Sequence, residues 1–257
     1  MQLLPPSKLK FLESWTLFGD PMHLVTILVL YFSILKFGPI LMRDRKPFQL
    51  TNFIKLYNVF QIVACCAFSY IAIVKYNYNV YYETWQCRTY DDFAKTPEEL
   101  VGIFEFYWYY FILRTVELVE TVFFVLRKKP EQASFLHIYH HVSTIVMYYL
   151  MNRYSVSPME SYVAILNNKV HILMYTYYLC SSFNSIKKKV AKFKPILTAV
   201  QIIQLMLILG QCFAAKFCGQ NNLFYAFMGN ISILLFFFGD FYYKTYLRKD
   251  KSEKLKQ

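Results

Sequence analysis

Seven apolar stretches, each of about 20 residues, constrain the fold of this chain more than any other feature of its sequence. A helix of that length crosses the roughly 30 Å of hydrocarbon in a bilayer. The stretches cover, approximately, residues 24–42, 54–74, 103–126, 133–151, 159–183, 195–217 and 222–243. Strands that span a membrane alternate with a period of two, and these stretches do not. The sequence therefore predicts an all-α membrane protein with seven transmembrane helices, in a single polytopic domain over residues 1–257.

Composition supports this class against the soluble ones. Hydrophobic residues make up 56% of the 257 residues and charged residues only 17%, whereas roughly 25% of an ordinary soluble domain is charged. The formal net charge of +12 would suggest nucleic-acid binding in a soluble domain. Here the charges lie between apolar stretches, so we expect the lipid bilayer, and no nucleic acid, as a partner.

The basic residues are distributed between alternate loops as the positive-inside rule requires. They cluster after the first span, after the third, between the fifth and the sixth, and in the tail 244–257. The loops on the opposite side carry fewer, and the loop 76–102 holds five acidic residues. We therefore expect a cytosolic basic tail at 244–257 and an N-terminus on the outer or lumenal side.

Ionisable side chains interrupt the third apolar stretch. Arg114, Glu117, Glu120 and Thr121 follow one another in steps of three, three and one, and residues three or four apart share a helix face. Charged groups within hydrocarbon are costly, so they indicate a functional site by default. A purely structural ion pair between Arg114 and Glu117 is the alternative.

Four of the five histidines lie in the fourth and fifth stretches. His137, His140 and His141 occupy positions i, i+3 and i+4, and Asn167 precedes His171 by one turn. The same pattern continues with three residues: Met174, Tyr175 and Tyr178. A lone histidine in an apolar helix is often only a hydrogen-bonded core residue, but a cluster of this kind predicts a reaction centre.

Three chemistries can use such a cluster. A di-iron centre of the membrane desaturase kind needs more imidazoles than this chain has. A zinc site of two or three histidines with Glu117 or Glu120 has enough ligands, although the His-Glu-x-x-His arrangement is absent. Metal-free acyl transfer can use a neutral imidazole as nucleophile or base, helped by carboxylates and amides. The residues alone leave the last two open, together with a seven-span receptor.

Four polar motifs follow one another in the sequence: Arg114-x-x-Glu117-x-x-Glu120-Thr121, His137-x-x-His140-His141, Asn167-x-x-x-His171-x-x-Met174-Tyr175-x-Tyr177-Tyr178, and Thr198-x-x-Gln201-x-x-Gln204. In this order, and over nearly the whole chain, they resemble the ELO (ELOVL) family of very-long-chain fatty acid elongases. The family pattern has Lys and Asp where this chain has Arg114 and Glu120, and both replacements keep the charge. Lys169 also departs from the pattern, and we expect it to face away from His171.

The resemblance implies an enzyme of the endoplasmic-reticulum membrane, an acyltransferase of the very-long-chain 3-oxoacyl-CoA synthase type. Such an enzyme condenses a long-chain acyl-CoA with malonyl-CoA and releases 3-oxoacyl-CoA, CO2 and CoA. The resemblance also implies six helices around a substrate tunnel and no metal or other cofactor. It allows other enzymes of the elongation cycle, or a second copy of the chain, as protein partners.

Roles for single residues follow from the resemblance. His140 is expected to attack the acyl thioester, with His171 near the reacting carbonyl and His137 and His141 positioning substrate or supplying protons. Carboxylates and amides assist in catalysis: Glu117, Glu120, Asn167 and Gln204. Substrate-binding candidates are Arg114, Lys128, Lys129, Tyr175, Tyr178, Gln201, Lys187, Lys188 and Lys189.

Two cysteines fall outside the apolar stretches. The predicted topology places Cys87 and Cys218 in lumenal loops, and the lumen of the endoplasmic reticulum is oxidising enough to sustain a disulfide. We therefore predict a disulfide between them. The other four cysteines lie within the spans, where a free cysteine behaves as a small buried hydrophobic residue.

Overall fold

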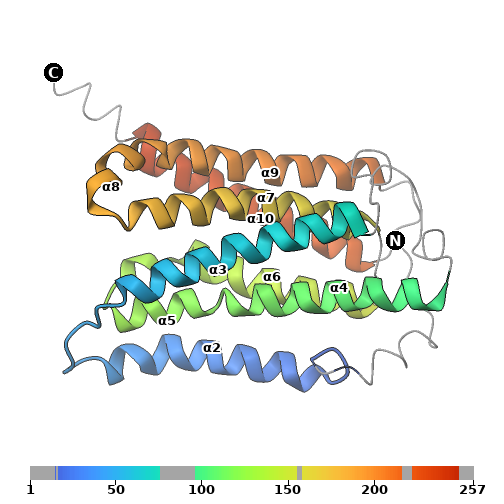
Figure 1. Ribbon diagram of the computed structural model, residues 1–257, viewed down its shortest axis with the longest axis horizontal. Coiled ribbons are helices and arrows are strands. Elements are labelled where there is room, and N and C mark those ends of the chain that lie inside the picture. The colour runs from blue at the N-terminus through green and yellow to red at the C-terminus, as the bar shows by residue number, and fades with distance from the viewer. Residues whose placement is uncertain (1–14, 16, 76–95, 155–157, 216–221, 249–257) are drawn as a thin grey trace. The chain divides into compact units, whose positions relative to one another are not determined.

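The computed structural model describes residues 15, 17–75, 96–154, 158–215 and 222–248, and among these residues it contains helices and no strand (Figure 1). The long helices in this part of the chain are α2 (Pro21–Leu41), α3 (Thr51–Tyr70), α4 (Pro97–Val116), α6 (Phe135–Tyr154), α7 (Pro158–Ser181), α9 (Lys194–Ala215) and α10 (Asn222–Tyr242). The shorter elements are α5 (Val119–Leu126), α8 (Asn184–Val190), η1 (Ile71–Lys75), η4 (Pro130–Gln132), η5 (Ala191–Phe193) and η6 (Tyr243–Leu247). The all-helical class predicted from the sequence is confirmed for the described residues.

Four helical segments of this part of the chain are both long and apolar enough to cross a membrane: Pro21–Leu41, Thr51–Val74, Asn184–Ala214 and Asn222–Leu247. The helices α4, α6 and α7 occupy the third to fifth predicted spans and have 20, 20 and 24 residues, but they carry more polar side chains. The four apolar segments indicate a multi-pass membrane protein. Seven transmembrane helices and an enclosed tunnel stay predictions.

Local capping sets where two of these helices begin. The Asp20 side chain accepts a hydrogen bond of 2.8 Å from the Met22 N–H, and Pro21 occupies the first turn of α2. The Thr96 hydroxyl accepts one of 3.2 Å from the Glu99 N–H at the start of α4. Both caps satisfy a backbone donor that the first turn of a helix leaves without an intrahelical partner.

The third predicted span, 103–126, contains most of α4 and all of α5, which a two-residue turn at Glu117 and Leu118 separates. Between α4 and α5 the Glu117 N–H bonds to Arg114 O at 3.3 Å and the Leu118 N–H to Thr115 O at 3.1 Å. Bonds of this three-residue spacing tighten the helix. The Thr115 hydroxyl also donates to Phe111 O at 2.9 Å, a side-chain contact that bends helices. The α-helical hydrogen-bond pattern is therefore interrupted just before Glu120.

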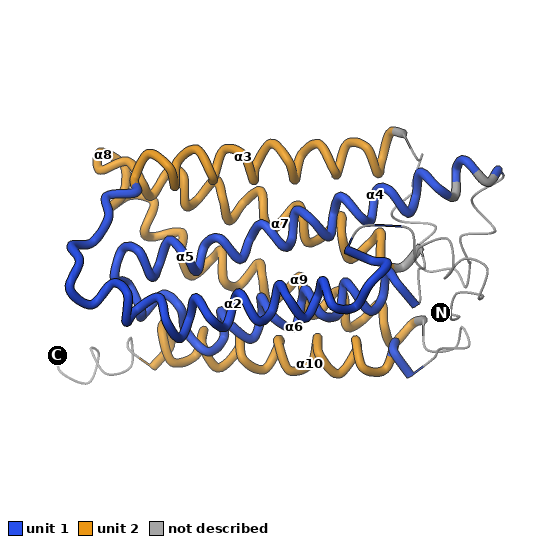
Figure 2. Tube along the Cα trace, turned by 90° about the horizontal axis from the view of Figure 1, so that it is seen from below, with its two compact units in different colours: residues 1–50, 87–158, 218–224 blue, residues 51–86, 159–217, 225–257 orange. Residues whose placement is uncertain are grey.

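Contacts divide the chain into two compact units, which we describe separately (Figure 2). The first unit comprises residues 1–50, 87–158 and 218–224, and the second comprises residues 51–86, 159–217 and 225–257. In the first unit α2 packs along α5, and α4 packs along α6. These two pairings position the residues of the candidate site.

An aromatic cluster and a buried arginine hold the segment before α2 in the first unit. Phe18, Phe111, Ile145 and Tyr149 form a buried cluster. The Arg153 guanidinium, at the end of α6, donates hydrogen bonds to Phe18 O and, at 3.0 Å, to Gly19 O. Arg153 is buried, and these hydrogen bonds give it a structural role in the first unit.

The pairing of α2 with α5 depends on a glycine. A Cβ atom at Gly38 would lie 2.7 Å from Val125 Cγ1, so no other residue fits there without movement. Beyond the end of α2, the Lys128 ammonium donates to Arg43 O at 2.9 Å, and the Phe48 N–H donates to Leu126 O at 3.0 Å. The end of α5 is therefore bound both to α2 and to the segment that follows it.

Candidate functional site

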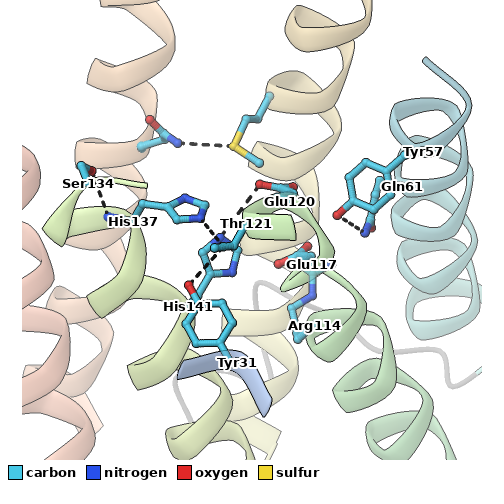
Figure 3. A network of polar contacts seen from close by, with 12 residues as sticks. Tyr31, Tyr57, Gln61, Arg114, Glu117, Glu120, Thr121, Ser134, His137 and His141 are labelled. Atoms are coloured by element: carbon cyan, nitrogen blue, oxygen red, sulfur yellow. Dashed lines mark hydrogen bonds and ion pairs between the residues drawn. The ribbon is translucent and has the colours of Figure 1, made fainter. Parts of the chain in front are cut away.

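The first unit brings together polar side chains from three helices (Figure 3). Glu120 and Thr121 come from α5, His137 and His141 from α6, and Tyr31 from α2. The two histidines are four residues apart, so they share a face of α6, and their ring centroids lie 4.2 Å apart. The spacing predicted from the sequence is thus realised in the structure for these two imidazoles.

A chain of two hydrogen bonds connects α2 to His137. Thr121 Oγ1 lies 3.0 Å from His137 Nε2 and 3.1 Å from Tyr31 Oη. Thr121 is fully buried, and Tyr31 retains only 2% exposure. Thr121 belongs to one of the four polar motifs of the sequence, whereas Tyr31 belongs to none of them.

The second contact between α5 and α6 joins a carboxylate to an imidazole. His141 Nε2 lies 3.9 Å from a Glu120 carboxylate oxygen, and both side chains are largely buried. One ligand atom from each of Glu120, His137 and His141 lies within 4.8 Å of the other two. Two histidines and a glutamate form a known catalytic zinc ligand set, so the metal site that the sequence left open has the geometry to hold an ion.

Arg114 and Glu117 form the ion pair that the sequence offered as the structural alternative. The guanidinium Nη1 lies 2.7 Å from a carboxylate oxygen of Glu117, with side-chain exposures of 1% and 4%. The guanidinium also lies 4.8 Å from the centroid of the Tyr110 ring. Neutralising each other inside the unit is therefore one function of these two residues, whatever role they have toward a substrate.

His140 lies between these contacts in sequence but differs from its neighbours in direction. It precedes His141 by one residue, so the two side chains leave α6 about 100° apart. Their ring centroids are 5.6 Å apart with the planes nearly perpendicular. His140 is half-buried. His137 and His141 both make their described contacts to α5, which suits positioning roles.

The second unit carries the other histidine motif on α7. The rings of His171 and Tyr175 lie 5.7 Å apart, and those of Tyr175 and Tyr178 lie 6.2 Å apart. His171 and Tyr175 are buried, whereas Tyr178 is exposed. Lys169 is exposed as well, which agrees with the expectation that it faces away from His171.

Two further contacts of the second unit involve the predicted motifs. The Gln201 side-chain amide donates to Met174 Sδ at 3.7 Å, which joins α9 to α7. The Tyr57 ring, on α3, lies 5.9 Å from the Tyr175 ring. Gln61 Nε2 donates to Tyr57 Oη at 2.9 Å. Tyr57 and Gln61 were not among the residues predicted from the sequence, although their spacing of four within an apolar stretch is a signal that could have indicated them.

The remaining amides of the motifs also lie in this unit. Asn167 is half-buried on α7, and Gln204 is buried on α9. The Thr198 hydroxyl, one turn before Gln201, donates to Lys194 O at 3.2 Å and lies 3.5 Å from Tyr246 Oη. The structure therefore gives these residues positions within the second unit, while their catalytic roles stay predictions.

The lysines predicted to bind CoA phosphates lie on the surface. In the first unit, Lys128 donates to the Arg43 carbonyl, and the Lys129 ammonium lies 3.8 Å from a Glu131 carboxylate oxygen. Three lysines of α8 in the second unit are exposed: Lys187, Lys188 and Lys189. Cys87 and Cys218 lie outside the described residues, so the predicted disulfide stays a prediction.

Comparison with known proteins identifies relatives of this sequence. The family model described as "ELO: GNS1/SUR4 family" matches residues 16–254. The chain is 30% identical over 243 residues to very long chain fatty acid elongase 1 of Mus musculus, covering 92% of this chain and 86% of the relative. It is 31% identical over 245 residues to very long chain fatty acid elongase 4 of Homo sapiens, covering 94% and 77%. It is 32% identical over 251 residues to very long chain fatty acid elongase F of Drosophila simulans, covering 92% of each chain.

Proposed function

Because this chain belongs to the ELO family, whose relatives are named very long chain fatty acid elongases, we propose that it condenses a long-chain acyl-CoA with malonyl-CoA. The products are a 3-oxoacyl-CoA longer by two carbons, CO2 and CoA. The buried cluster of Glu120, Thr121, His137 and His141 carries this proposal. Imidazoles held by a carboxylate and a hydroxyl within an apolar protein suit acyl transfer.

The reaction proceeds in two balanced steps. First, a ring nitrogen of neutral His140 attacks the thioester carbonyl, the carbon–sulfur bond breaks, and the thiolate leaves as CoA with the imidazole proton. Second, malonyl-CoA loses its carboxylate as CO2, and the resulting enolate attacks the acyl carbon. The carbon–nitrogen bond then breaks, and the imidazole regains a proton from the medium. One proton is consumed in each cycle.

The neighbours of His140 assist these steps. Glu120, with a carboxylate oxygen 3.9 Å from His141 Nε2, stabilises positive charge that develops on this imidazole during the reaction. His137 positions the substrate. The proposal also keeps the roles predicted from the sequence for His171, as a partner at the reacting carbonyl, and for Asn167 and Gln204, as donors to developing oxyanions.

The basic surface and the apolar helices define the setting of the enzyme. Exposed Lys187, Lys188 and Lys189 attract the phosphates of CoA. The enzyme resides in the endoplasmic-reticulum membrane with a lumenal N-terminus and a cytosolic C-terminus. Other enzymes of the elongation cycle, or a second copy of the chain, are its protein partners, and it uses no redox cofactor because condensation involves no net oxidation.

Incubation of membranes containing the protein with labelled malonyl-CoA and a panel of acyl-CoAs tests the proposal. We expect labelled 3-oxoacyl product with at least one chain length. Incubation with the same acyl-CoA alone should release CoA and add one acyl mass to the protein, and His140→Ala should lose both signals. Elongation by the wild type without any acylated protein would overturn the covalent step.

A metal-dependent lipid enzyme is the second candidate, favoured by the 4.8 Å grouping of Glu120, His137 and His141. An ion bound to His137 Nε2 would have to displace the hydrogen bond to Thr121, whereas an ion bound to Nδ1 would leave that bond in place. Strong chelators separate the two candidates. Unchanged elongation after chelation supports the first, whereas loss of activity that zinc restores supports the second.

A further inference from the structure

The hydrogen-bonded chain from Tyr31 through Thr121 to His137 has one direction in which both hydroxyl groups donate a hydrogen bond. Tyr31 is buried at 2% exposure, and Thr121 Oγ1, at 3.1 Å, is its hydrogen-bond partner among the described residues. A buried hydroxyl that fails to donate loses a full hydrogen bond. The Tyr31 hydroxyl therefore donates to Thr121, rather than accepting from it.

The direction of the Tyr31–Thr121 hydrogen bond determines which atom donates in the hydrogen bond between Thr121 and His137. The Thr121 oxygen could also accept from a protonated His137 Nε2, but the hydrogen of this fully buried hydroxyl would then have no acceptor among the described residues. The Thr121 hydrogen therefore points to His137 Nε2, 3.0 Å away. A neutral imidazole carries one proton, and the nitrogen that accepts a hydrogen bond lacks it. His137 consequently carries its proton on Nδ1.

We propose that Tyr31 is a positioning residue of the acyl-transfer site, because its hydroxyl orients Thr121 and thereby holds His137 in the Nδ1–H tautomer. In that tautomer the Nδ1–H is a fixed hydrogen-bond donor beside His141, whose ring centroid is 4.2 Å away. Nε2 is occupied, so His137 is neither the nucleophile nor the general base. This inference rests on the proposed function, and it assigns one of the roles that the histidine spacing left undivided.

The proposal makes α2 part of the catalytic apparatus. Gly38 lies seven residues after Tyr31, which is two turns along the helix, so both occupy the same face of α2. That face packs along α5 at Val125, four residues after Thr121. The close approach at Gly38 therefore keeps the Tyr31 hydroxyl within reach of Thr121.

Nitrogen NMR of histidine reads the tautomer directly. The full-length protein is labelled with 15N-histidine in lipid bilayers, and the His137 resonances are identified by their loss in His137→Gln. We expect a protonated Nδ1 and an unprotonated Nε2 in the wild type and in Thr121→Ser, which keeps the hydroxyl. In Tyr31→Phe and Thr121→Val we expect a second tautomer. A protonated Nε2 in the neutral imidazole of the wild type would overturn the assigned direction.

Elongation kinetics test the positioning role. Losing one neutral hydrogen bond predicts a fall in kcat of about threefold to tenfold in Tyr31→Phe, with both KM values within about twofold. Thr121→Val should lose at least as much, and Thr121→Ser should recover most of it. Tyr149→Phe is the matched control, since its buried hydroxyl has no hydrogen-bond partner in the part of the chain that is described.

The outcomes separate this inference from the proposed function. The NMR measurement needs no activity, so a wild type that elongates no acyl-CoA refutes the proposed function and leaves the tautomer to be decided on its own. An altered tautomer in Tyr31→Phe with unchanged kcat refutes the positioning role. If kcat falls as much in Tyr149→Phe as in Tyr31→Phe, the positioning role is refuted as well. The fall would then be a general effect of removing a buried hydroxyl.

Discussion

Gly38→Ala tests the contact that holds α2 against α5. The new Cβ would lie 2.7 Å from Val125 Cγ1, whereas carbon atoms pack at roughly 3.5–4.0 Å. One helix or the valine must therefore move by about 1 Å. Val125 cannot easily turn away, because a β-branched side chain in a helix has one strongly preferred rotamer.

The expected cost follows from this overlap. Overpacking a filled site costs about 1–3 kcal/mol, while replacing glycine by alanine within a helix returns about 1 kcal/mol. A glycine with open space around it shows the gain from glycine-to-alanine replacement alone, without any overpacking. A Cβ at Gly229, on α10, has nothing within 4 Å. The difference in unfolding free energy between Gly38→Ala and Gly229→Ala should therefore be about 1–3 kcal/mol, with Gly38→Ala the less stable.

Denaturant unfolding of the two variants in the same detergent micelles measures this difference. Adding Val125→Ala to Gly38→Ala removes the atom that the new Cβ meets, so the double variant should show a favourable coupling energy. Elongation should fall in Gly38→Ala, because displacement of α2 also displaces Tyr31. If Gly38→Ala and Gly229→Ala are equally stable, the close packing of α2 on α5 is refuted.

Three further outcomes are expected. His140→Ala should abolish condensation and leave a folded membrane protein; a rate loss below tenfold would reject its role as nucleophile, since removing a nucleophile costs several orders of magnitude. Arg114→Gln should lower the free energy of unfolding by about 3–5 kcal/mol, because it leaves the Glu117 carboxylate buried without its ion-pair partner. Adding Glu117→Gln should recover part of this loss, and losses that simply add in the double variant would contradict the prediction. A non-reducing digest should join the peptides of Cys87 and Cys218; alkylatable thiols at both positions would reject the disulfide and weaken the assigned topology.

The helices and the histidine face followed from local sequence, but the break in the third span did not. The apolar stretch at 133–151 lies close to α6 (Phe135–Tyr154), because apolar length is a local property. Neither glycine nor proline marks the turn at Glu117, and the nearby hydrogen bond from the Thr115 hydroxyl to Phe111 O is visible only in the structure. The single helix predicted over 103–126 was therefore a reasonable reading of the pattern.

The candidate site was predictable where it depends on spacing within one helix. His137 and His141 share a face because they are four residues apart. Tyr31 bonds to Thr121 across 90 positions, and one tyrosine among 23 carries no signal of its own. Arg153, likewise, bonds to backbone carbonyls more than a hundred positions away. Contacts of this kind require the folded chain.

The long-range contacts of α2 also bear on the order in which the chain is synthesised. The partners of Tyr31, Arg43 and Gly19 lie 90, 85 and 134 positions further along the chain. A ribosome must therefore complete α5 and α6 before α2 and the residues that flank it can form these contacts. Until then, α2 depends on its own length and side chains to remain in the bilayer. It has the highest mean hydropathy of the four apolar segments in the described part of the chain. This composition suits a helix that must stay in the bilayer before α5 and α6 are synthesised.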